Sequence, residues 1–121
     1  MKYEPAFDIE EKAKEIIRKL EFNHIKLDDI AFIRSSGSSS RRTIARCHAL
    51  GKIMQKALNR KAFYTLEFLS ERFDRMNEGD KTKVIIHELM HIPKCFGGGF
   101  KHHNYVTERN INKLYERFLE K

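Results

Sequence analysis

The sequence predicts a small α+β domain in which the elements follow the order helix, strands, helix, loop and helix. Three observations support this class: amphipathic periodicity near both ends, short aromatic and β-branched runs between them, and an apolar helical segment at residues 84–92. We expect a small sheet to pack on the N-terminal helix and on this apolar helix, with a C-terminal helix beside them. The length of 121 residues predicts a single domain over residues 1–121.

The helices are predicted from spacing and from capping residues. Residues 6–22 have apolar positions at the intervals of one helix face: Ile9, Ala13, Ile16, Ile17 and Leu20. Asp80 is expected to cap a helix that runs to about Ile92, where Pro93 biases the chain out of the α region. Thr107 is expected to cap the last helix.

The strands are predicted from short runs between turn-forming residues. Strands are expected at residues 30–33, 43–50 and 63–69. The Ser/Gly segment 35–40 predicts a loop, and residues 70–76 predict a short helical turn. Residues 52–58 fit a strand or a helix, and the triple glycine at 97–99 predicts a flexible connection.

Composition excludes several classes of protein. The two cysteines and the lack of a leader-like start argue against a secreted domain built on disulfides. The longest apolar run is far too short to span a membrane. The expectation is a soluble cytoplasmic protein.

The net charge of +7 and the pI near 9.5 are compatible with nucleic-acid contacts. The basic residues read as dispersed, which is typical of a solvated surface. The densest pair, Arg41 and Arg42, follows the loop sequence SSGSSS, and no nucleic-acid motif accompanies it. Nucleic acid is therefore a weakly supported partner.

The segment VIIHELMH carries the most specific chemistry in the chain. On a helical wheel His87 and His91 lie roughly 40° apart, so both imidazoles project to one side. Apolar neighbours cover most of the remaining arc and predict that both histidines are buried, where a shared metal ion would satisfy them. HELMH matches the H-E-x-x-H zinc motif, in which Glu88 takes a proton from a water activated by Zn²⁺.

A catalytic zinc usually has a third protein ligand, and several residues compete for that role. Cys95 follows Pro93, which turns the chain away, and is expected to be a small buried side chain. Glu108, in the first turn of the last helix, is a feasible acidic ligand. His102 and His103 follow the triple glycine, which lets the chain return to the metal, and we expect one of these two neighbours to be the ligand.

The stretch from residue 45 to residue 118 resembles a family of phage and archaeal metallopeptidases, which are small zincin-like proteins. The resemblance rests on ARCHALGKIMQKAL, FYTLEFLSERFDRM, KVIIHELMHIP, FGGGFKHH and VTERNINKLY. It implies a minimal zincin-like domain in which His87 and His91 bind Zn²⁺ and Glu88 is the general base. The family's spacing after the glycines implies His103 as the third ligand, and the doubled histidine keeps His102 as the alternative.

The leading functional prediction is therefore a zinc metallopeptidase that acts on a peptide or protein substrate. His102, Tyr105 and His48 are candidates to stabilise the oxyanion, and residues 63–69 are considered as a sheet edge that pairs with the substrate. The alternative is a catalytically weak zinc-binding interaction protein, associated with nucleic acid. A further reading makes HELMH a core helix without a metal.

Overall fold

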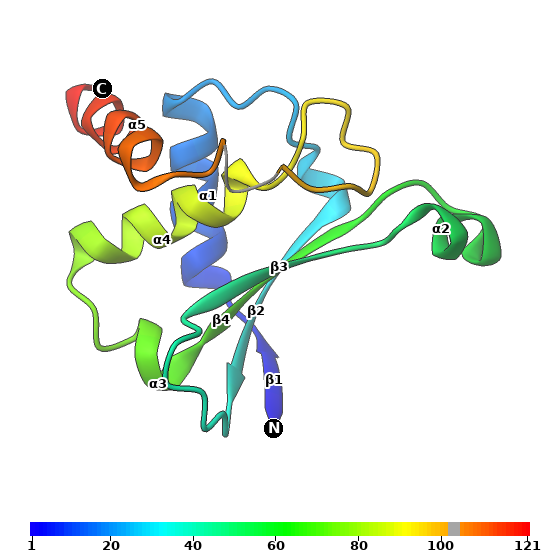
Figure 1. Ribbon diagram of the computed structural model, residues 1–121, viewed down its shortest axis with the longest axis horizontal. Helices are drawn as coiled ribbons and strands as arrows, with labels where there is room; N and C mark the ends of the chain where they lie inside the picture. Colours follow the sequence, from blue (N-terminus) through cyan, green and yellow to red (C-terminus); the bar gives the residue numbers. More distant parts are fainter. Residues whose placement is uncertain (102–104) are drawn as a thin grey trace.

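The structure is a computed structural model that describes residues 1–101 and 105–121, and it has the predicted α+β character (Figure 1). The strands are β1 (Lys2–Pro5), β2 (Ile30–Ser36), β3 (Ala45–Ala49) and β4 (Tyr64–Leu69). The α-helices are α1 (Phe7–Lys19), α2 (Lys52–Leu58), α3 (Ser70–Phe73), α4 (Glu78–Met90) and α5 (Glu108–Glu120). A 3₁₀ turn at Leu27–Asp29 precedes β2.

The four strands form one sheet in the order β1-β2-β4-β3. β2 and β4 are parallel, whereas β1 pairs with β2 and β3 pairs with β4 in antiparallel register. The segment considered as a substrate-binding edge, β4, thus lies in the interior of the sheet. The edge strand beside β4 is β3.

One face of the sheet forms the core with α1 and α4. Tyr64, Leu66 and Phe68 alternate along β4, point to this face and are fully buried. They pack with buried isoleucine and leucine side chains of the two helices: Ile16 and Ile17 from α1, and Ile85, Ile86 and Leu89 from α4. This packing fixes α4 against the sheet, and α4 carries the H-E-x-x-H sequence.

The opposite face of the sheet carries a buried carboxylate, Glu67. Its Oε2 accepts a hydrogen bond of 2.7 Å from Ser35 Oγ, and its Oε1 lies 3.0 Å from Arg46 Nε and 2.7 Å from His48 Nε2. Burial alone would raise the pKa of Glu67, but these three partners together hold it below its usual range. The network therefore joins β2, β4 and β3 on the face away from the core.

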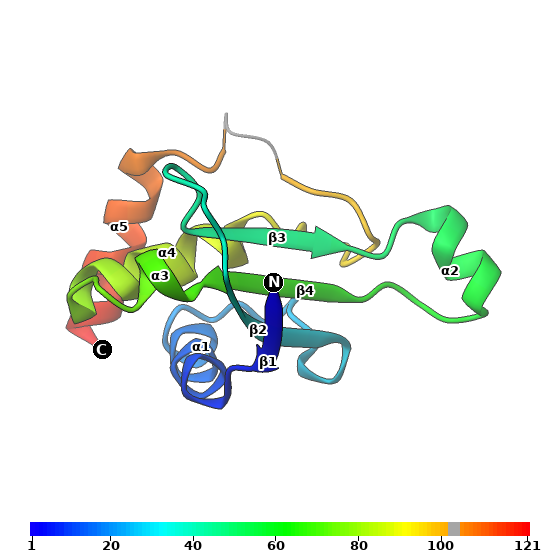
Figure 2. The same cartoon turned by 90° about the horizontal axis from the view of Figure 1, so that it is seen from below.

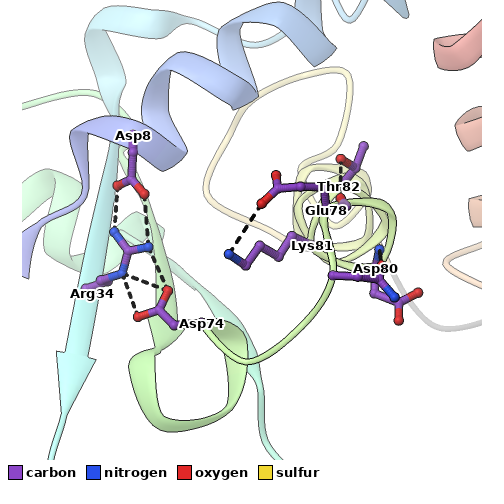
Figure 3. Close-up of polar contacts among 8 residues, drawn as sticks. Asp8, Arg34, Asp74, Glu78, Asp80, Lys81 and Thr82 are labelled. Carbon is purple, nitrogen blue, oxygen red and sulfur yellow. Dashed lines mark hydrogen bonds and ion pairs between the residues drawn. The ribbon is translucent and has the colours of Figure 1, made fainter.

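Arg34 joins β2 to two helices (Figure 3). Its guanidinium donates to Asp8 in α1 at 2.6 Å and to Asp74, directly after α3, at 2.7 Å. The fork geometry of arginine allows it to bind both carboxylates at once. These contacts hold α1 and α3 at the same end of the sheet.

The helix caps confirm one prediction and correct another. Thr107 caps α5 as expected, because its side chain accepts a hydrogen bond from Asn110 N. The prediction that Asp80 caps α4 is wrong: Asn77 is the cap, and its Oδ1 accepts from the N–H of Asp80 at 2.8 Å (Figure 3). Both residue types favour this position, and the helix begins at the earlier one.

No helix in the described part of the chain is both long enough and apolar enough to cross a membrane.

Candidate metal centre and cleft

A cleft of about 570 Å³ lies between β3 and α4. One wall is formed by consecutive residues at the start of β3, and the other by the face of α4 that carries the motif. Its lining includes Arg42, Ala45, Cys47, His87, Glu88 and His91, together with Phe100 and Lys101 from the segment after α4. Consecutive residues line the cleft, so it is bordered by the edge of β3 that pairs with no strand in the described part of the chain.

His87 and His91 lie next to each other on the cleft face of α4. Their ring centres are 5.1 Å apart and the rings are tilted by 43°. Two imidazoles that bind one tetrahedral ion through bonds of roughly 2.0–2.1 Å have ring centres about 5 Å apart, so the spacing fits a shared metal. Both side chains are half-buried and face the cleft, so the prediction that they are buried is wrong.

His91 is held by two hydrogen bonds to Lys101. The carbonyl of His91, left without a helical partner at the end of α4, accepts from Lys101 N at 2.8 Å. In the opposite direction, His91 Nδ1 lies 2.9 Å from the carbonyl oxygen of Lys101. A carbonyl only accepts, so Nδ1 is the donor in this hydrogen bond. A metal-binding histidine is commonly oriented in this way.

Glu88 is 6% exposed and lines the same cleft. Burial raises the pKa of its carboxyl to about 7, because the charged form loses the stabilisation that water would give. Cys47 on the facing strand is affected in the same way, since burial first and the charge of Glu88 second raise the pKa of its thiol to about 12. Glu88 is thus a carboxylate with raised proton affinity beside two imidazoles.

The glycine segment after α4 has defined contacts, which differs from the flexible connection expected from its sequence. The hydroxyl of Tyr64 accepts from Gly98 N at 2.9 Å and donates to Gly99 O at 2.8 Å. Gln55 in α2 donates to Gly97 O at 3.0 Å. Gly98 has φ of +103°, and a Cβ there would lie 2.6 Å from Leu50 O, so only glycine fits.

The third ligand is not found within the described residues. No group of three or more His, Cys, Asp or Glu side chains that could hold a metal ion occurs in residues 1–101 and 105–121. His102 and His103, the two favoured candidates, lie outside these residues. Glu108 shares a separate hollow of about 360 Å³ with His87 but is not grouped with the histidine pair. Cys95 is exposed, contrary to the buried position expected for it.

Some residues at the cleft were not identified from the sequence. Cys47, Arg42 and Lys101 line it, and the alternation of the small residues Ala45, Cys47 and Ala49 along β3 is a sequence signal that could have indicated this wall. His48, considered as an oxyanion stabiliser, instead contacts Glu67 on the other face of the sheet. Tyr105 is 43% exposed and is not among the lining residues of the cleft.

An H-E-x-x-H sequence on a helix beside a cleft is typical of metal-dependent proteases. The comparison with protein families agrees with this class: residues 1–120 match the family described as "Putative phage metallopeptidase". The chain therefore belongs to that metallopeptidase family. No curated protein and no solved structure matches the chain.

Proposed function

We propose that this chain is a zinc-dependent peptidase in which His87 and His91 hold Zn²⁺ and Glu88 is the general base. The observation that carries the proposal is the arrangement of His91. Its Nδ1 is bound to the Lys101 carbonyl, which orients the ring toward the cleft face of α4, and the ring of His87 lies at the distance that a shared ion requires. The third ligand proposed is His103, with His102 as the alternative.

The chemistry follows from the positions of these side chains. When bound, Zn²⁺ supplies Lewis acidity that lowers the pKa of a water to roughly 7 and polarises a carbonyl. Glu88 takes a proton from the attacking water and passes it to the amine nitrogen when the C–N bond breaks. Without the metal, burial raises the pKa of Glu88 to about 7, so its carboxylate is a stronger base than an exposed one.

The substrate is proposed to lie along β3. Among the described residues this strand pairs with β4 alone, and the residues at its start line the cleft. An extended peptide adds to such a sheet edge through main-chain hydrogen bonds. Its carbonyl carbon would then lie between the edge of β3 and Glu88.

The test is a comparison of wild type with Glu88→Gln. We expect the variant to retain about one zinc per chain and to lose peptide hydrolysis by at least about 100-fold, because proton transfer alone contributes roughly 10²–10⁴-fold. Zinc is measured by elemental analysis and hydrolysis by mass spectrometry of a denatured protein substrate. Equal hydrolysis by both proteins would refute the role of Glu88.

A further inference from the structure

α2 connects β3 to β4 in the chain, and it projects from the body of the molecule. Figures 1 and 2 both show it beyond the far end of this strand pair, away from α1, α4 and α5. Its three largest apolar side chains are exposed: Ile53 by 82%, Met54 by 48% and Leu58 by 57%. At helical spacing they fall within an arc of about 140°. A clustered apolar face of this kind usually marks an interaction surface.

The excess positive charge of the chain falls in the sequence segment that contains β3 and α2. Residues 41–61 contain seven Lys and Arg and no Asp or Glu. The rest of the chain holds the other 17 Lys and Arg, which its 17 Asp and Glu balance. The net charge of +7 therefore comes from this one segment, because it holds no acidic residue, although Lys and Arg occur along the whole chain.

Part of this charge is neutralised by carboxylates from elsewhere. Asp29 lies 2.9 Å from Arg60 and 3.5 Å from Lys61, and Glu67 lies 3.0 Å from Arg46. Four exposed cations of the segment have no ion pair with any residue that the structure describes: Arg41, Arg42, Lys52 and Lys56. Lys52 and Lys56 lie on α2, whereas Arg41 and Arg42 precede β3 at the cleft end of that strand.

Two hollows of different character flank α2. One, of about 570 Å³, has no carboxylate among its lining residues, which are Lys52, Gln55, Lys56, Asn59, Arg60 and Lys61. The other, of about 400 Å³, lies between α2 and the sheet and has an apolar lining that includes Leu50, Leu58 and Phe63. Arg60 borders both. A ligand that fills the two hollows must therefore carry negative charge and apolar groups close together.

We propose that α2 and these two hollows bind an acidic polypeptide segment with apolar side chains, and that this segment is part of the substrate. The second half of this statement rests on the proposed function. The carboxylates of the ligand would enter the cationic hollow, and its apolar side chains would cover Ile53 and Leu58.

The route from α2 to the cleft supports this substrate. Ala49 and Leu50 line the apolar hollow, whereas Cys47 lines the cleft, and three residues of a strand span about 10 Å. Arg42 and Lys101 add positive charge at the cleft itself. An acidic chain that follows β3 would thus reach both sites.

Other anionic partners fit less of the surface. A nucleic acid would use the cationic hollow but leave the apolar hollow and the exposed face of α2 uncovered. A flat anionic membrane would contact α2 without filling either hollow. A second copy of this chain, docked through the same segment, would bring seven cations against seven.

The test measures peptide binding to the full chain carrying Glu88→Gln, so that nothing is cleaved. The probe is a fluorescein-labelled 16-residue peptide of Glu, Leu and Ser, and its counterpart has Gln in place of each Glu. We expect the acidic peptide to bind at least about tenfold more tightly in fluorescence anisotropy, with the difference shrinking as salt rises.

Variants of α2 locate the binding surface. Lys52→Gln with Lys56→Gln, and separately Ile53→Ser with Leu58→Ser, should each weaken binding of the acidic peptide about fivefold. All four side chains are exposed, so folding should be retained. The matched control is Lys113→Gln with Arg117→Gln on α5, which removes the same charge from two exposed residues and should leave binding unchanged.

Three results would overturn the inference: equal affinity for the two peptides, α2 variants that bind like the control, or stronger competition by oligo(dT) or by phosphatidylserine vesicles than by the unlabelled acidic peptide.

Hydrolysis separates this inference from the proposed function. If wild type cleaves both peptides with equal kcat/KM, the substrate preference is wrong and the peptidase stands. If wild type cleaves neither peptide but still binds the acidic one selectively, the docking surface is supported and the docked peptide is not a substrate.

Discussion

At its start β3 borders a cleft with a buried carboxylate and two half-buried histidines, whereas past its end α2 exposes apolar and cationic side chains to solvent. The first region is defined by contacts: His91 is bound to Lys101, and the glycine segment is bound to Tyr64. The second has few contacts and an unbalanced charge. Chemistry needs fixed geometry, whereas recognition of an extended chain needs accessible surface, and the short strand β3 connects the two.

The largest expected difference between the regions is in metal binding. His87→Ala should lower zinc affinity by more than about 100-fold, because a first ligand is lost. Lys56→Ala in α2 should leave it unchanged. Zinc titration with a competing chelator measures both. Full zinc occupancy in His87→Ala would place the metal, if any, away from α4.

Cysteine reactivity should differ next most strongly. With a pKa of about 12, Cys47 has roughly one thiolate in 10⁴ at pH 8, whereas Cys95 is exposed. Iodoacetamide should therefore modify Cys95 at least about 100-fold faster, as read by mass spectrometry of tryptic peptides. Cys95→Ser should abolish the fast reaction. Similar rates at both sites would mean that the β3 wall of the cleft is open to solvent.

Tyr64→Phe tests whether the glycine segment is held by the hydroxyl. The variant loses the bonds to Gly98 N and Gly99 O, and the free energy of unfolding should fall by about 1–3 kcal/mol. Urea unfolding measures this change, and Tyr3→Phe, at a side chain 63% exposed, is the control. Zinc affinity should fall with it, because the segment leads toward His102 and His103. Unchanged stability would show that backbone contacts alone hold the segment.

The smallest effect is expected at the Arg34 network. The hydrogen bond from Arg34 is the main cause that holds the pKa of Asp8 below its usual value. The stabilisation is therefore present above the unfolded-state pKa and is lost as the pH falls through the lower folded-state pKa. Asp8→Asn should cost about 0.5 kcal/mol at pH 7 and progressively less as the pH falls through the folded-state pKa of Asp8. Asp28→Asn, at an exposed carboxylate, is the control. An equal loss of stability in both variants would show that the ion pair with Arg34 is not the cause.

The sequence predicted the elements whose burial is periodic. α1 and α5 follow from their apolar faces, and the strands of the sheet interior follow from apolar runs. β1 was missed because its four residues, KYEP, are all exposed and include a proline, which is tolerated at a sheet edge. α2 remained undecided because none of its residues is buried, so its pattern reflects no packing.

The site was predicted as far as one helix could reveal it. H-E-x-x-H spacing brings together the three motif residues of α4 without any knowledge of the fold. The position of Cys47 in the wall of the cleft, by contrast, depends on how β3 pairs with β4. In that pairing Cys47 lies opposite Leu66. The exposure of His87 and His91 depends on a cleft that only the packed sheet creates. Strand order and register are tertiary properties, and local spacing does not encode them.

The position of α2 in the chain has a consequence for limited proteolysis. An exposed segment with Lys56, Arg60 and Lys61 is a preferred target for trypsin. A cut there would leave β2 and β3 in one fragment and β4 in the other, yet the strand order places β4 between β2 and β3. The two fragments would therefore remain associated through the sheet, as a nicked but folded molecule.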